Sequence, residues 1–260
     1  MQAIILAAGC GSRLGRFNND SPKALIKMEK IHLIDYQLSV LRYFGITDVC
    51  VVVGYQADML QSVLGDRCYC ICNNRYADTN SLYSLWLARK WVSDDLLLIN
   101  SDVLAHPDIF WRLLTNPGNS LVYDSTSSVE EESMKVALEG DKLLHISKSL
   151  GVDESKGESL GILKFQASAT KVLFREAEKA ISTGGVNQWA PAAVQGFVHK
   201  LPMTCIDMAG LPWVEIDYVE DLLNASKMVW PEIRKSITSP PYTHAFALPA
   251  SSSVKTDSGD

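Results

Sequence analysis

The stretch that decides the fold is Met1-Gln-Ala-Ile-Ile-Leu-Ala-Ala-Gly-Cys-Gly-Ser-Arg-Leu-Gly15, followed by Ser21-Pro-Lys-Ala-Leu25. The apolar run from Ala3 to Ala8 predicts a buried strand, and it passes directly into a glycine-rich loop. Glycines let the backbone approach an anion closely and present its N–H groups to it. We therefore expect a phosphate-binding turn directly after the first strand.

The spacing of this loop separates it from two better-known phosphate loops. Gly9, Gly11 and Gly15 read G-x-G-x-x-x-G, whereas a dinucleotide-binding loop reads G-x-G-x-x-G and is followed by an acidic residue about 20 positions on. The Gly-Lys-Ser/Thr of a P-loop is absent. A tight turn without a ligand remains an alternative, but it gives no reason for Arg13 and Lys23 to accompany the glycines.

Composition excludes several classes of protein. The chain has 260 residues, 47% of them hydrophobic, which is enough for one large α/β domain. Its formal net charge of −6 argues against nucleic acid or a membrane surface as the main partner. We expect a cytoplasmic protein, because no signal peptide and no apolar stretch of about 20 residues is visible.

The 6 cysteines do not have the spacing of a metal site. Cys68, Cys70 and Cys72 alternate along one segment, which places all three on one face of a predicted strand. We expect them to be small buried hydrophobic residues in a reducing compartment, in preference to metal ligands.

Strand and helix patterns alternate through the first hundred residues. Strands are predicted at 4–8, 49–53, 68–72 and 96–99, with helices at 35–44, 57–64 and 81–91. Such alternation is typical of a mostly parallel sheet that helices cover on both faces. The predicted fold class is therefore α/β.

Shorter strands follow. They are predicted at 121–123, 135–138, 143–146, 160–165, 205–208 and 213–216, with helices at 169–181 and 219–230. We expect a single domain over residues 1–235 with a β-rich insertion around 120–165. Residues 236–260, rich in serine and proline, are expected to form a flexible tail.

Two segments place carboxylates after apolar strands. Asp102 follows the strand at 96–99, at the sheet edge where α/β folds bind ligands. Glu215 and Asp217 alternate along a later strand and share one face. Asp102 and Asp217 together suit Mg²⁺, which prefers one or two carboxylates plus substrate phosphates, with Glu215 as a third ligand or a neighbour. A helix cap remains an alternative for Asp102.

These motifs resemble the nucleotidyltransferase (NTP-transferase) superfamily, which joins a nucleoside triphosphate to a phosphorylated small molecule and releases pyrophosphate. The resemblance covers residues 1 to about 230. The phosphocholine-cytidylyltransferase-like branch is indicated by the stretches 76–85, 157–162 and 213–217, and by Asn100-Ser101-Asp102 where sugar-nucleotide enzymes usually have Gly-Asp or Gly-Gly-Thr. It implies a Rossmann-like three-layer sandwich with a mostly parallel mixed sheet, as in nucleotide-diphospho-sugar transferases.

The resemblance also implies roles for individual residues. Arg13 and Lys23 are expected to act in catalysis, and Asp102 and Asp217 to hold Mg²⁺. The residues expected to contact the nucleotide are Leu6, Ala7, Ala8, Gly9, Gly11, Ser12, Thr79, Asn80, Ser81 and Ser101.

Thr79, Asn80 and Ser81 are expected to read the base. They open a predicted helix, whose free N–H groups and side chains would pair with the edge of a pyrimidine. Plain capping of the helix is the alternative, and the two roles are compatible.

The acceptor is harder to infer. Candidate acceptor-binding residues are Lys135, Lys148, Glu158, Trp189 and Glu215. A quaternary ammonium would need an aromatic cage, but tryptophan and tyrosine are as often core residues. For each lysine, a solvated surface side chain is the alternative.

The sequence therefore predicts a CTP-dependent cytidylyltransferase that transfers CMP to a small phosphorylated or phosphonate acceptor, phosphocholine-like in one version. The alternatives are a sugar-1-phosphate or inositol-1-phosphate nucleotidyltransferase, and a catalytically dead nucleotide-binding protein. The oligomeric state stays open, with a homodimer as one option.

Overall fold

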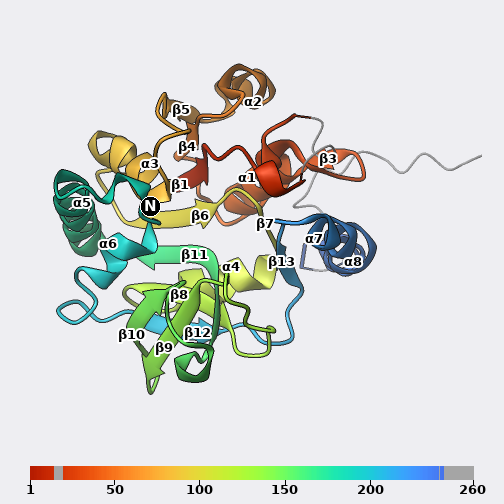
Figure 1. Cartoon of the computed structure of the whole chain (residues 1–260). Coiled ribbons are helices and arrows are strands. Elements are labelled where there is room, and N and C mark those ends of the chain that lie inside the picture. The colour runs from red at the N-terminus through yellow and green to blue at the C-terminus, as the bar shows by residue number, and fades with distance from the viewer. Residues whose placement is uncertain (15–19, 240, 243–260) are drawn as a thin grey trace, which may run out of the picture.

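The computed structural model describes residues 1–14, 20–239 and 241–242. Gly15 therefore lies outside the described residues. The main feature of the fold is one nine-stranded sheet in the order β5-β4-β1-β6-β11-β8-β12-β10-β9 (Figure 1). The predicted α/β class is confirmed.

The first half of the sheet is parallel. It consists of β5 (Tyr69–Cys72), β4 (Val49–Val53), β1 (Gln2–Ala7) and β6 (Leu96–Asn100). Every residue of β1 and β4 is buried, as the unbroken apolar runs predicted. Alternate residues of β1 enter two separate cores, Ala3, Ile5 and Ala7 one, and Ile4 and Leu6 the other. The sheet is thus the middle layer of three.

The second half of the sheet is mixed. It contains β8 (Ser120–Asp124), β9 (Lys135–Glu139), β10 (Lys142–Ser147), β11 (Gly157–Phe165) and β12 (Thr204–Asp207). β11 runs antiparallel to β6 and β8, whereas β12 runs parallel to β8. The strands predicted between 120 and 165 therefore join the main sheet, with the β9–β10 hairpin at its edge. Their description as an insertion in a domain of residues 1–235 stays a prediction.

Helices cover both faces (Figure 1). On one face lie α1 (Leu33–Tyr43), α2 (Ala57–Leu64), α4 (Pro107–Thr115) and α8 (Trp230–Ile237). On the other lie α3 (Ser81–Leu87), α5 (Ala167–Ser182) and α6 (Pro191–Gln195). The predicted helix at 35–44 is confirmed as α1, which ends at Tyr43. Gly45 follows it with a φ of 76°, which suits a glycine after a helix.

A small two-stranded sheet brings distant segments together. β7 (Val103–Ala105) pairs antiparallel with β13 (Trp213–Glu215). Beyond this pairing, the Ile216 N–H donates to the carbonyl of Asp102 at 3.0 Å. Asp102 and Asp217 consequently lie at the same end of this sheet although they are far apart in the sequence.

The C-terminal helix differs from its predicted bounds. α7 (Val219–Asn224) continues through a π-helical turn (Ala225–Val229) into α8, which ends at Ile237. Tyr242 is buried, and its hydroxyl donates to Asp108. Ile237 and Tyr242 are thus packed against the domain, unlike the expected tail, and residues 243–260 lie outside the described residues.

The expectation for the cysteines is wrong in part. Cys50 and Cys205 are buried, but Cys68 and Cys70 are only half-buried and Cys72 is exposed. The reason is that β5 is the edge strand of the sheet, so that its side chains are covered less than those of a central strand.

In the part of the chain that the structure describes, no helix has the length and apolar character to cross a membrane.

Candidate active site

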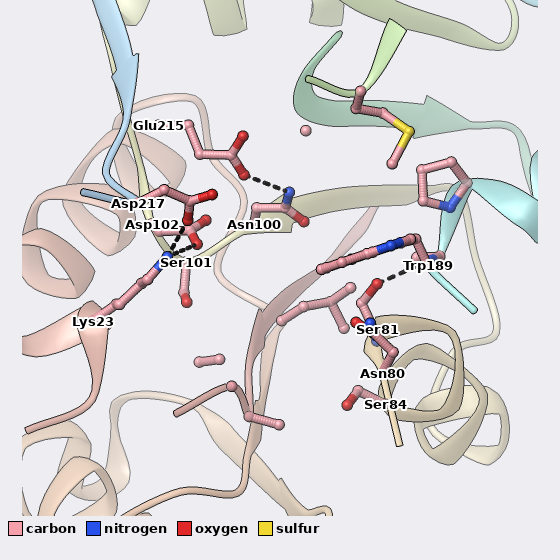
Figure 2. Close-up of a pocket in the computed structure, with 18 of the residues that line it drawn as sticks. Lys23, Asn80, Ser81, Ser84, Asn100, Ser101, Asp102, Trp189, Glu215 and Asp217 are labelled. Atoms are coloured by element: carbon pink, nitrogen blue, oxygen red, sulfur yellow. Dashed lines mark hydrogen bonds and ion pairs between the residues drawn. The ribbon is translucent and has the colours of Figure 1, made fainter. Parts of the chain in front are cut away.

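One pocket of about 320 Å³ opens where the parallel strands β1 and β6 end (Figure 2). This edge is where α/β sheets bind ligands. All the predicted site residues except Lys135 and Glu158 line it, namely Leu6, Ala7, Ala8, Gly9, Gly11, Ser12, Arg13, Lys23, Thr79, Asn80, Ser81, Ser101, Asp102, Lys148, Trp189, Glu215 and Asp217.

The glycine-rich loop forms one wall of the pocket. Gly11 has a φ of 58°, and a Cβ at this position would lie 2.7 Å from Cγ of Lys23. A side chain at this position would therefore displace the lysine as well as strain the backbone. The requirement for glycine at position 11 therefore comes from both the positive φ and the close approach of Lys23.

Lys23 lies between the two predicted metal-binding carboxylates. Its Nζ is 3.2 Å from Oδ2 of Asp102 and also donates to Oδ1 of Asp217 (Figure 2). Burial by itself would lower the pKa of Lys23, but the two carboxylates outweigh burial and raise the pKa above its usual value. The amine is therefore a fixed positive charge at the centre of the site.

Neighbouring side chains fix the positions of both acids. Gln37 of α1 is buried, and its Nε2 donates to the carbonyls of Asn100 and Val103, each at 2.9 Å, so that it holds the turn that contains Asp102. Oδ2 of Asp221 accepts the N–H of Asp217 at 3.0 Å. The spacing of the two acids is thus set by contacts outside the pocket.

The same acids can be tested as a metal site. Both carboxylates touch one Nζ, so a cation near that position would lie within reach of both. Hard carboxylate oxygens beside a phosphate loop suit a divalent cation. Among the described residues no three His, Cys, Asp or Glu side chains are grouped closely enough to hold a metal. The arrangement therefore suits a cation that takes two protein ligands and completes its shell with phosphates and water.

Glu215 does not join the two aspartates. Its Oε1 accepts from Nδ2 of Asn100 at 3.5 Å, and the side chain points toward Asn100 in Figure 2. Burial, with smaller contributions from Asp102 and Asp217, raises the pKa of Glu215 to about 8. It is therefore mostly protonated near pH 7, and the structure does not form the three-carboxylate group in which Glu215 would be a third ligand.

Gly161 of β11 leaves the room that Asn100 needs. Its φ is 69°, and a Cβ there would lie 2.4 Å from Nδ2 of Asn100. We expect Gly161→Ala to lower the melting temperature by roughly 2–8 °C, corresponding to about 1–2 kcal/mol, and to reduce turnover, because Asn100 must move away from Glu215. Thermal unfolding and pyrophosphate release measure the two effects.

Gly118→Ala is the matched control for this prediction. Gly118 has a φ of 79° and nothing within 4 Å of an added Cβ, so it reports backbone strain alone. Equal losses of stability and unchanged turnover in both variants would contradict the proposed contact with Asn100.

The polar residues expected to read the base are present, but one part of that expectation is wrong. The first N–H groups of α3 are not free. The N–H of Ser81 donates to Oδ1 of Asn80 at 2.7 Å, and that of Leu82 donates to the carbonyl of Gln188 at 3.1 Å. The N–H groups of Tyr83 and Ser84 both donate to the carbonyl of Asn80. Recognition of a base by this end of α3 must therefore use side chains. The capping role of Asn80 is confirmed.

The buried Asn73 supports this wall from behind. Its Nδ2 donates to the hydroxyls of Thr79 at 3.1 Å and Ser84 at 3.0 Å, and the Thr79 hydroxyl in turn donates to the carbonyl of Arg75 at 2.7 Å. The Thr79 hydroxyl is thus engaged within the loop. Asn80 and Ser81 remain the polar side chains best placed to face a ligand.

Two predicted acceptor residues, Lys135 and Glu158, do not line the pocket. Lys135 is 1% exposed, and its Nζ donates to the carbonyls of Glu130, Glu131 and Ser133. Glu158 accepts from the Ser127 hydroxyl at 3.0 Å. Lys135 is therefore a structural lysine that closes the 130–133 turn, because a buried ammonium needs several acceptors.

The other two candidates, Lys148 and Trp189, meet in the pocket. Nζ of Lys148 lies 4.4 Å above the ring of Trp189. Glu132 is 3.8 Å from the same amine and 2.8 Å from Nη2 of Arg13, whose guanidinium is also 3.4 Å from Asp217. The cations of the pocket are thus joined to its anions in a chain that runs from Asp217 to Lys148.

A comparison with known families decides the identity of this site. The profile of the MobA-like NTP transferase domain matches residues 3–150. The chain belongs to this family. It is a nucleotidyltransferase of the phosphocholine-cytidylyltransferase-like branch, as the resemblance implied.

Individual relatives agree with this assignment. The choline-phosphate cytidylyltransferase of Streptococcus pneumoniae (strain ATCC BAA-255 / R6) is 30% identical over 231 residues, which cover 85% of this chain and 95% of that protein. The CTP:phosphoglutamine cytidylyltransferase of Campylobacter jejuni subsp. jejuni is 24% identical over 248 residues, covering 85% and 98%.

A solved structure of CTP:phosphocholine cytidylyltransferase from Streptococcus pneumoniae superposes with a TM-score of 0.69 at 27% identity. It covers 86% of this chain and 97% of that one. The likeness therefore extends over nearly the whole described nucleotidyltransferase fold.

Several residues that shape the site give no signal in the sequence. Gln37 and Asp221 lie on helices, and Glu132 lies in a loop between two strands, so nothing in their local pattern relates them to Asp102, Asp217 or Arg13. Asn100 was visible as the residue before Ser101-Asp102, and its position at the end of an apolar strand was the available signal.

Proposed function

We propose that this nucleotidyltransferase transfers CMP from CTP to a small acceptor that carries a phosphate or phosphonate, with Mg²⁺ as its metal. The observation that supports this most is that three sets of groups line one pocket: Asn80 and Ser81, Arg13 and Lys23 beside the glycine loop, and Lys148 over the ring of Trp189. These sets match a base, a triphosphate and a second anion.

The relatives favour the same substrates. Two curated relatives that match nearly their whole length are a choline-phosphate and a CTP:phosphoglutamine cytidylyltransferase. CTP and a small phosphorylated compound are common to both names, whereas the compound differs. We therefore extend CTP and the class of acceptor to this chain, but not either particular acceptor.

The reaction depends on positioning of the substrates and neutralisation of their charge, and it does not need a general base to remove a proton. An oxygen of the acceptor phosphate forms a new bond to the α-phosphorus of CTP, the bond from that phosphorus to the β-phosphate bridge breaks, and pyrophosphate leaves with the electron pair. The attacking oxygen is already an anion. Arg13 and Lys23 would hold the β- and γ-phosphates and stabilise the charge that grows there.

Asp102 and Asp217 would hold Mg²⁺. When bound, the ion would supply Lewis-acid polarisation of the α-phosphate. In this arrangement Lys23 would give up part of its contact with the aspartates and turn toward the triphosphate. The lysine amine and the acids thus exchange partners with the substrate, so that neither charge is left buried and unpaired.

Lys148 would bind the acceptor. Its amine is held over Trp189 and lies 3.8 Å from Glu132, so one incoming anion could replace that long contact. Glu132 is 58% exposed and would move into solvent at little cost. We place the acceptor phosphate between Lys148 and Arg13.

We expect CTP to be preferred over UTP, ATP and GTP by about tenfold or more in kcat/KM. The Nδ2 group of Asn80 can donate to the O2 or N3 acceptor of cytosine, and each buried hydrogen bond that is lost costs about 1–3 kcal/mol. Pyrophosphate release from the four triphosphates, with phosphocholine, 2-aminoethylphosphonate, glucose 1-phosphate and inositol 1-phosphate as acceptors, measures the preference.

Asn80→Ala should reduce the discrimination between CTP and the other triphosphates, whereas Asn74→Ala, an exposed asparagine outside the pocket, should leave it unchanged. Equal use of CTP and a purine triphosphate with a sugar 1-phosphate would replace the proposal by the sugar-phosphate alternative. Absence of turnover with every pair would favour a nucleotide-binding protein without catalysis.

A further inference from the structure

Three hydrogen bonds join the base side of the pocket to its acceptor side. The Asn80 N–H donates to the carbonyl of Val186 at 3.0 Å, and the Leu82 N–H donates to that of Gln188 at 3.1 Å. The Ala190 N–H donates to the hydroxyl of Ser81 at 2.8 Å, the contact drawn beside Trp189 in Figure 2. The segment 186–190 is therefore attached to the start of α3.

Of these three bonds, only the last uses a side chain. Ala190 is 3% exposed, so its N–H has no access to water if the Ser81 hydroxyl is removed. The residue directly before it is Trp189, whose ring lies under the amine of Lys148 at 4.4 Å. The position of the lysine thus depends on the ring, and that of the ring on the backbone which Ser81 holds.

Lys148 itself has few other restraints. Its second contact is with Glu132 at 3.8 Å, and that carboxylate also accepts from Arg13 at 2.8 Å. Because the shorter bond goes to Arg13, Glu132 follows the guanidinium more closely than the amine. The ring of Trp189 is therefore the main support of Lys148 among the described contacts.

We infer that Ser81 is a positioning residue for the acceptor as well as a wall of the nucleotide site. Its hydroxyl holds the Ala190 backbone, which fixes Trp189, which in turn supports the amine that receives the acceptor's anionic group. This inference rests on the proposed role of Lys148 in the function above. It assigns to Ser81, a residue predicted to read the base, an effect on binding of the acceptor.

The experiment compares Ser81→Ala with Ser84→Ala on the same helix. Ser84 Oγ accepts from Nδ2 of Asn73 at 3.0 Å, so its hydrogen bond lies on the side of α3 that faces Asn73 and not with Ala190. KM for each substrate and kcat are measured with the triphosphate and acceptor that the wild type turns over fastest in the panel described above. Calorimetry with each substrate alone gives the corresponding dissociation constants.

For Ser81→Ala we expect the acceptor KM and dissociation constant to rise about tenfold while those of the triphosphate change less than about threefold. Lys148→Ala should show the same selective effect, and the double variant should add little to it. Ser81→Thr, which keeps the hydroxyl, should restore acceptor binding. Ser84→Ala should leave the acceptor constants unchanged.

Other outcomes would overturn the inference. An equal or larger effect of Ser81→Ala on the triphosphate would make it a nucleotide residue only, and no rescue by Ser81→Thr would indicate a general loss of structure. If Ser81→Ala does not fold, Ser81→Cys replaces it, since a thiol fills the same space but accepts hydrogen bonds weakly. Failure of CTP turnover in the wild type, with another triphosphate active, would refute the proposed base while leaving this comparison intact.

Discussion

Asp102→Ala and Asp217→Ala should each leave a protein that folds and binds nucleotide but turns over at least about 10³-fold more slowly than the wild type. The two carboxylates face one point in the pocket, where Nζ of Lys23 contacts both of them. If the two carboxylates hold Mg²⁺ as proposed, loss of either one would remove half of the protein's ligands for the ion and leave it poorly placed. Pyrophosphate release at saturating substrates and magnesium measures the loss.

Glu220→Ala is a suitable control, because Glu220 is an exposed acid three residues after Asp217. Thermal unfolding should show that both aspartate variants remain folded. EDTA should abolish the activity of the wild type, and added Mg²⁺ should restore it. Activity that survives EDTA, or a near-normal rate in either aspartate variant, would remove the metal from the proposed mechanism.

Lys23→Ala should lower turnover by about 10²-fold or more, which corresponds to about 2.7 kcal/mol of lost stabilisation in the transition state. The amine is 13% exposed and neutralises two carboxylates. Without it, the negative charge of Asp102 and Asp217 would repel an incoming triphosphate, and the departing pyrophosphate would lose a cation. Arg13→Ala should produce a loss of the same order.

Lys27→Ala is the control for Lys23→Ala, since Lys27 is exposed and lies one short helix further along the chain. Lys23→Met keeps the apolar stem that Gly11 contacts and removes only the charge. A rate close to that of the wild type in Lys23→Met would mean that the packing of this stem, and not its charge, is what the glycine loop requires.

The hydrophobic pattern of the sequence predicted which segments form strands and helices, because that pattern is local. Buried parallel strands are continuous apolar runs, so β1, β4 and β6 could be read directly. The exposure of β5 could not, since a central and an edge strand share the same pattern and only the order of the strands distinguishes them. The antiparallel direction of β11 likewise depends on the path of the chain between strands.

The site follows the same rule. The glycine loop, Lys23, Asp102 and Asp217 are recognisable because residue type and position after a strand point to them. Lys135 and Lys148 are indistinguishable by such criteria. The backbone of the 130–133 turn surrounds the first, whereas an aromatic ring 41 positions away supports the second.

The attachment of the 186–190 segment to α3 bears on attempts to give this enzyme a new acceptor. In two of the three hydrogen bonds the segment contributes only backbone carbonyls, at Val186 and Gln188, and any replacement sequence would supply these. Only the bond to Ser81 depends on a side chain. A loop grafted from a relative should therefore dock correctly if the host keeps a hydroxyl at position 81 and the graft keeps an N–H in place of that of Ala190. Donor loops can then be chosen for the acceptor alone, without redesign of the nucleotide site.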